Sequence, residues 1–165
     1  MAIYTGKHPE TFGEVVEIAK HFHNKCRWLG NGAVEDSLTG YTVISGNGIF
    51  GSETVLLTSI QTPIDVGVGN TLWDLNRVFP LTLSSTTAYI LRWIWGTGTV
   101  GDAEAARQYS ESIIMSTGLG ANVRGSSTDI MMPRLPIGTK LWAKCKNATN
   151  LATITMIVGI HEYLR

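Results

Sequence analysis

The fold class follows most directly from one C-terminal stretch, Ala152-Thr-Ile-Thr-Met-Ile-Val-Gly-Ile-His-Glu-Tyr163. β-Branched residues dominate it, and one set of alternate positions, from Ala152 to Ile160, is wholly apolar. The other set mixes threonine, isoleucine, glycine and tyrosine with a single histidine, so neither face is strongly polar. The stretch therefore predicts a strand that lies in the centre of a sheet or in an interface.

The same texture continues back to Tyr41, with short runs rich in Val, Ile, Thr, Trp and Tyr separated by Gly, Pro, Asn and Ser. We predict a mainly β fold: a jelly-roll-like β-sandwich with an N-terminal α-helix. The sandwich body spans residues 41–165, and residues 1–40 form an N-terminal arm and helix. A partly helical alternative stays open for 105–115. The predicted strands are 41–44, 53–60, 71–79, 87–95, 111–116, 128–132, 139–147 and 152–163.

One segment, residues 11–29, has helical periodicity, because its apolar residues recur at steps of three and four along one face. Thr11 and Glu14 form a capping box at its start, and Gly30 with the Asn31-Gly32 pair ends it. We predict a helix of about 17 residues here. The residues of its apolar face are Phe12, Val15, Val16, Ala19, Phe22, Cys26 and Leu29.

Charged residues make up 16% of the chain, below the roughly 25% of an average domain, so we expect part of the surface to be covered by protein. Lys plus Arg equals Asp plus Glu at 13 each, which gives no global field toward nucleic acid or an anionic membrane. No segment reaches the roughly 20 apolar residues of a membrane span, and the N-terminus lacks the apolar stretch of a signal peptide. We therefore expect neither nucleic acid nor a membrane as a partner.

Gly96-Thr-Gly-Thr-Val-Gly101 matches the dinucleotide fingerprint G-x-G-x-x-G and follows a predicted strand. The fingerprint works only in a parallel βαβ unit, whose second strand carries an acidic residue about 20 positions further on. Here the chain runs into Gly118, Gly120 and Gly125, and the nearby Asp129 is poorly placed. We predict a glycine-rich sheet loop and no cofactor, with nucleotide binding as the alternative.

His21, His23 and Cys26 resemble metal-ligand spacing. Residues two apart on a helix point about 200° from each other, so the two histidines cannot share a metal, although His23 and Cys26 could. No G-x-S-x-G elbow is present, and His161, at the end of an apolar strand, is expected to be structural. Cys26 and Cys145 match no redox spacing and are expected to be reduced. We predict no metal site, no catalytic residue and no enzyme.

Side chains alternate along residues 139–147, where one face carries a tryptophan among three lysines and the other is apolar. We interpret the first face as a possible surface-binding patch for sugar, phosphate or an acidic protein surface. The alternative is a solvated strand that its lysines protect from edge pairing. The Asn147-Ala-Thr149 sequon is expected to be silent, because no secretory signal accompanies it. The residues of the patch are Lys140, Trp142, Lys144 and Lys146.

Four segments, Ala88–Gly96, Asp102–Ala106, Met132–Ala143 and Gly159–Tyr163, share their texture and arrangement with a known class of sequence. They read AYILRWIWG, DAEAA, MPRLPIGTKLWA and GIHEY, and in them the chain resembles virion proteins of tailed bacteriophages. The resemblance implies a jelly-roll module, commonly trimeric or otherwise oligomeric. Such a module is attached to the capsid as a decoration or cement protein, or to the tail. The first 40 residues do not share the resemblance.

The expected function is therefore that of a non-enzymatic virion structural protein, assembled in the host cytoplasm into the capsid. Its expected partners are copies of itself, in a homo-oligomer such as a trimer, and the major capsid protein or other virion proteins. The alternatives are a carbohydrate-binding or tail receptor-binding module that uses exposed aromatics such as Trp73, or an enzyme with a nucleotide or metal site. The residues predicted to lie at interfaces are Phe12, Phe22, Trp28, Trp93 and Trp95.

Overall fold

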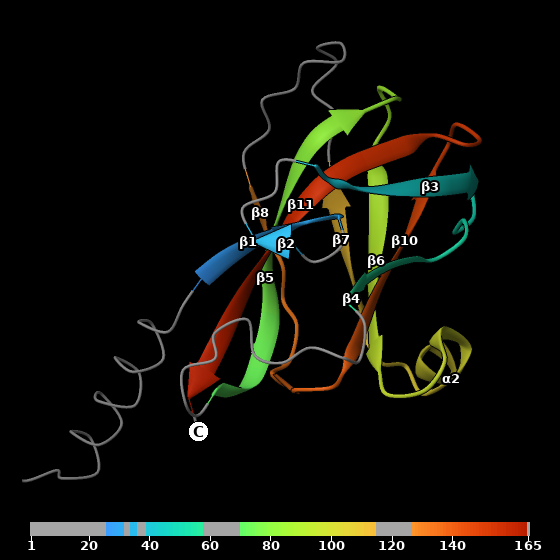
Figure 1. Cartoon of the computed structure of the whole chain (residues 1–165). Helices are drawn as coiled ribbons and strands as arrows, with labels where there is room; N and C mark the ends of the chain where they lie inside the picture. Colours follow the sequence, from blue (N-terminus) through green and yellow to red (C-terminus); the bar gives the residue numbers. More distant parts are fainter. Residues whose placement is uncertain (1–25, 32–33, 36–38, 58–69, 115–126, 165) are drawn as a thin grey trace, which may run out of the picture.

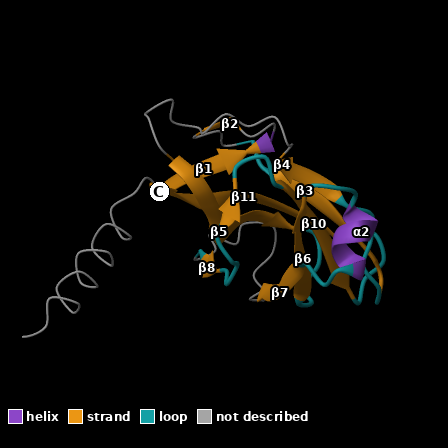
Figure 2. Ribbon diagram, turned by 90° about the horizontal axis from the view of Figure 1, so that it is seen from below, coloured by secondary structure: helices purple, strands orange, loops and turns teal. Residues whose placement is uncertain are grey.

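The computed structural model describes residues 26–31, 34–35, 39–57, 70–114 and 127–164. These residues form a mainly β structure (Figures 1 and 2), as the sequence predicts. The described part of the chain contains one α-helix, α2 (Val100–Ala105), which lies beside the sheet in Figure 2. A capping box between Thr99 and Asp102 starts this helix.

Each of the eight predicted strands overlaps an observed strand, although 128–132 shortens to two residues and 71–79 extends at both ends. The strands before α2 are β1 (Cys26–Gly30), β2 (Val34–Glu35), β3 (Tyr41–Asn47), β4 (Thr54–Leu57), β5 (Asn70–Leu83) and β6 (Tyr89–Gly96). Those after it are β7 (Tyr109–Ile114), β8 (Thr128–Asp129), β9 (Leu135–Pro136), β10 (Lys140–Asn147) and β11 (Thr153–Leu164).

Strand β11 organises one half of the sheet, as residues 152–163 predict. It pairs antiparallel with β5 along one edge and with β1 and β3 along the other. Strand β3 then crosses to the other half, because its last residues pair parallel with the end of β10. On the far side, β10 pairs antiparallel with β6, and β6 with β7. The result is one curled sheet whose halves face each other (Figure 1).

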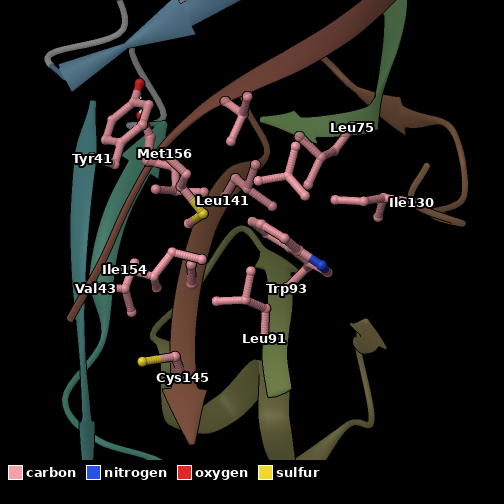
Figure 3. Close-up of a cluster of buried hydrophobic side chains, with 14 of the residues drawn as sticks. Tyr41, Val43, Leu75, Leu91, Trp93, Ile130, Leu141, Cys145, Ile154 and Met156 are labelled. Atoms are coloured by element: carbon pink, nitrogen blue, oxygen red, sulfur yellow. Dashed lines mark hydrogen bonds between the residues drawn. The ribbon is translucent and has the colours of Figure 1, made fainter. Parts of the chain in front are cut away.

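The core lies inside this curl, where alternate side chains of the two halves meet. From the β11 half come Ile154, Met156 and Val158, and from the β6 half comes Trp93, which is 0% exposed. Figure 3 shows the labelled core side chains pointing toward one another from different strands. A second, smaller cluster lies on the outer side of β6 and β10, beneath α2, and consists of Ile94, Ala103 and Trp142 with Val100 and Tyr109 packed against it.

The end of the predicted N-terminal helix is wrong. Residues 26–30 form β1, in which Cys26 pairs with His161 and Leu29 with Val158. Leu29 is buried, so its burial by β11 overrides the helical spacing. Strand β1 therefore belongs to the same sheet as the strands of 41–164. The rest of the predicted helix, 11–25, lies outside the described residues.

Cys145 is a free thiol in the core. Burial raises the pKa of this thiol to about 12, so it stays protonated at neutral pH and is a poor nucleophile or metal ligand.

Candidate functional site

The predicted cation and aromatic patch on β10 is covered. Trp142 is 6% exposed, because α2 folds back over the outer face of β10 and β6 and encloses the ring with Ala103. Lys140 donates from Nζ to the carbonyl oxygen of Gly98 at 3.1 Å, and Lys144 Nζ lies 2.7 Å from Oε2 of Glu104. The tryptophan of the predicted patch is therefore packed and not available for stacking on a ligand, while Lys140, Lys144 and Lys146 are half-buried.

Lys144 and Glu104 belong to an ion network centred on Arg92 of β6. Arg92 Nη1 lies 3.0 Å from Oε1 of Glu104, and Nη2 lies 2.6 Å from Oε1 of Glu111 on β7. The guanidinium carbon lies over the rings of Phe50, at 4.1 Å, and Tyr109, at 4.3 Å. With Lys144 on its other oxygen, Glu104 ties α2 to β6 and β10 together. The network therefore has a structural role, which is to hold α2 against β6 and β10.

Burial by itself raises the pKa of Glu104, but hydrogen bonds from Lys144 and Arg92 outweigh it and bring the pKa below its ordinary value of 4.5. A carboxyl group whose pKa is lowered by folding stabilises the fold above its unfolded pKa. That contribution is lost as the pH falls through the folded pKa.

We expect Glu104→Gln to lower the free energy of unfolding by about 1–2 kcal/mol at pH 7, since the amide loses two charge-assisted hydrogen bonds. The difference from the wild type should shrink below about pH 4.5, where the wild-type carboxyl also becomes protonated. Urea unfolding between pH 3 and 8 measures both effects. The exposed Glu53→Gln is the matched control, and an equal, pH-independent loss in both variants would contradict the assigned network.

The Gly96–Gly101 segment is a sheet connection, as predicted. It joins β6 to β7 through the single helix α2, and these two strands are antiparallel neighbours. A dinucleotide fingerprint requires a crossover that returns as a parallel strand. The motif match is therefore formal, and the fold around it is not the one that binds a dinucleotide.

The predicted interface aromatics have different environments. Trp93 is a core residue: its ring is enclosed, and Nε1 donates to Ser112 Oγ at 2.8 Å. It is therefore not available for an intermolecular contact, and that part of the prediction is wrong. Trp28 is half-buried against Phe79, with ring centroids 6.3 Å apart, and Trp95 is half-buried against the core. Phe12 and Phe22 lie outside the described residues.

A polar cluster lies between β5 and β11. Tyr163 Oη donates to Asp74 Oδ2 at 2.6 Å, and Nε2 of His161 is 2.9 Å from Nδ2 of Asn76. The guanidinium of Arg134 lies 4.3 Å from the Tyr163 ring centroid. Burial, together with the hydrogen bond to Asp74, raises the pKa of Tyr163 to about 12. This tyrosine therefore stays protonated as a donor and joins the two strands.

No cluster of three or more His, Cys, Asp or Glu side chains within the described ranges is placed to hold a metal ion. His21, His23 and the side chain of Cys26 lie outside them. In the part of the chain that the structure describes, no helix is long and apolar enough to cross a membrane.

Asn147, the last residue of β10, is 2% exposed, and its side chain makes four hydrogen bonds. Its Oδ1 accepts from the Thr149 N–H at 2.7 Å and from Thr87 Oγ1 at 2.8 Å. Its Nδ2 donates to the carbonyl oxygens of Thr87, at 3.3 Å, and Ala88, at 3.1 Å. The sequon asparagine is therefore enclosed in the folded chain, which supplies a structural reason for it to carry no glycan.

Several large apolar side chains are exposed that the sequence interpretation missed. They are Ile44, Ile49, Val55, Ile113, Met131, Ile137 and Leu151. Three of them, Ile44, Ile49 and Leu151, belong to the same end of the molecule as Asn147. The signal that could have pointed there is the absence of charge over residues 39–52, 78–91 and 147–160.

No model of a known protein family matches the chain, and comparison with curated proteins gives no match either.

Proposed function

We propose that the chain is a non-enzymatic structural protein of a tailed-bacteriophage virion, and that it decorates or cements the capsid. In this proposal the curled sheet is a jelly-roll-like sandwich, and the protein acts as a homo-oligomer such as a trimer. It stabilises the head through contacts with the major capsid protein or other virion proteins.

The observation that carries the proposal is the combination of exposed apolar side chains with a low density of charge. Leu151 is 68% exposed, Ile49 67% and Met131 91%, while charged residues make up 16% of the chain. Apolar side chains that stand out from a β framework and its loops gain free energy when another protein surface covers them. Contacts that each bury on the order of 1,200–2,000 Å² suffice for stable association.

The tryptophans weigh against the carbohydrate-binding alternative. A sugar platform needs an aromatic face open to solvent, but Trp73, Trp93 and Trp142 are buried, and Trp28 and Trp95 are half-buried. The exposed apolar side chains therefore favour contact with another protein over stacking on a glycan.

The proposal predicts that the purified chain co-sediments with capsids of the phage that encodes it, with saturable stoichiometry, and raises the temperature at which those capsids lose their genome. The matched control is capsid incubated with an equal mass of an unrelated β protein. If the chain stays in the supernatant, and mass spectrometry of purified particles does not detect it, the virion assignment is wrong.

A further inference from the structure

Three segments of the chain contain no Asp, Glu, Lys or Arg: residues 39–52, 78–91 and 147–160. They include the end of β3 and its following loop, the connection from β5 to β6, and the connection from β10 to β11. Their buried strand positions would carry no charge in any domain, but their exposed loop positions ordinarily would. Their neutrality would have little structural meaning if the segments lay apart, but they do not.

The three segments meet at one end of the sheet, at the upper right of Figure 1. The Ser45 N–H donates to the carbonyl oxygen of Ala152 at 2.8 Å, and Ser45 Oγ donates to that of Thr149 at 3.0 Å. Thr149 Oγ1 also lies 3.2 Å from Ser85 Oγ, which brings in the β5–β6 connection. With Asn147 bonded to Thr87 and Ala88, these hydrogen bonds join the loops into one surface. We name it the charge-free end, made of the exposed residues of 44–51, 84–88 and 147–152.

Apolar side chains stand out from this hydroxyl-rich surface. Ile44 is 45% exposed, and Ile49 and Leu151 are exposed still further. Ile49 lies over Gly46, where any added Cβ would meet the Ile49 side chain at 2.8 Å. The Leu151 N–H donates to the carbonyl oxygen of Ser45 at 3.2 Å, so Leu151 lies beside the end of β3 that carries Ile44.

Leu151 also has an unfavourable backbone conformation. Its φ is 55°, in the left-handed region that residues other than Gly, Asn and Asp rarely adopt. Nothing in the burial of its side chain offsets that cost, since the side chain is exposed. An intermolecular contact that buries the Leu151 side chain would offset the cost of this strained backbone.

The absence of charge indicates which partner fits. In a contact between identical copies about a symmetry axis, residues near the axis meet their own counterparts, so any ionised residue there would face a like charge. None of the exposed residues of the charge-free end is ionised, so they are free of this penalty, and the cores of interfaces are likewise depleted of charge. The cations of Arg92 and Lys146 lie at its border, against the ring of Phe50. A charged partner would find ions to pair with only at this border.

We propose that the charge-free end is a homotypic interface, occupied by the same surface of further copies of this chain. The charge-free end would thus supply the contact of the homo-oligomer in the proposed function. Self-association does not require the chain to belong to a virion, so this contact rests on the proposed function only for its biological setting.

The test is the dissociation constant of the full-length chain, measured by sedimentation equilibrium, for the wild type and three variants. Ile49→Lys places like charges in the contact, and Leu151→Asn removes the apolar side chain while supplying a residue that tolerates left-handed backbone. Met131→Lys is the matched control, because Met131 is an apolar residue even more open to solvent than Ile49 and Leu151 but lies outside the charge-free end. Circular dichroism confirms that each variant is folded.

We expect self-association of the wild type, at least about tenfold weaker in Ile49→Lys and Leu151→Asn and unchanged in Met131→Lys. Between about 0.05 and 0.5 M NaCl the wild-type constant should change by less than about twofold, since no ion pair forms in the contact. A wild type that stays monomeric up to about 1 mM overturns the inference, and so do equal effects of all three substitutions. Capsid binding is measured separately, so the two proposals can fail independently.

Discussion

Replacement of Trp93 by alanine is expected to lower the free energy of unfolding by about 3–5 kcal/mol, the largest effect of any single substitution proposed. The ring is 0% exposed and packs inside the curl, so its removal forfeits the transfer free energy and leaves a cavity lined by side chains of both halves of the sheet. Urea unfolding at equilibrium, at a protein concentration where the oligomeric state is constant, measures the change.

Two comparisons separate core from interface. Ser112→Ala removes only the acceptor of the Trp93 Nε1 hydrogen bond and should cost about 1 kcal/mol. Met131→Ala, at an exposed position, should lie within about 0.5 kcal/mol of the wild type. If Trp93→Ala left the free energy of unfolding unchanged and abolished self-association instead, Trp93 would be an interface residue, and its assignment to the core would be wrong.

The second large effect is expected for Asn147→Ala, at about 2–4 kcal/mol. The amide makes four part-buried hydrogen bonds, and its removal leaves two carbonyl oxygens and one backbone N–H without this partner. Because those groups belong to the β5–β6 and β10–β11 connections, the variant should also loosen the charge-free end. Thermal unfolding and hydrogen exchange at 84–88 and 147–152 measure the two consequences.

Asn150→Ala is the matched control, since it lies in the same connection and is exposed. It should change the free energy of unfolding by less than about 0.5 kcal/mol. Equal destabilisation by both substitutions would show that the loop sequence in general, and not the buried amide of Asn147, holds the connections together.

The strands were predictable because their signal is local. Alternation in 139–147 and 152–163 places the apolar set of β10 and the Ala152-to-Val158 set of β11 in the core, where they are found. The same set continues through Ile160, which is also buried in the core, although the pairing with β5 shifts register between Gly159 and Ile160. Such a bulge depends on the partner strand and leaves no mark in the alternation of either sequence.

The wrong predictions share one cause: the local sequence of a segment does not show which other segment will pack against it. Lys140 and Lys144 suggested a solvated face, but their charges are met by the Gly98 carbonyl and by Glu104 of α2. Leu29 fitted a helical stripe, but β11 offers it a buried position in a strand. The aromatic strand 89–95 suggested an interface, but the opposite half of the curled sheet covers Trp93. Each prediction failed where tertiary packing overrode a local pattern.

The position of β11 has a consequence for biosynthesis. Strands β1, β3 and β5 all pair with it, yet residues 153–164 leave the ribosome after every one of them. Until β11 emerges, the edges that it will join have no native partner, so this half of the sheet cannot close while its earlier strands are being translated. Its contacts span long separations in sequence, as between Cys26 and His161, and such contacts slow folding. A nascent chain halted before residue 153 therefore presents open β edges, and it is the species that most needs a chaperone.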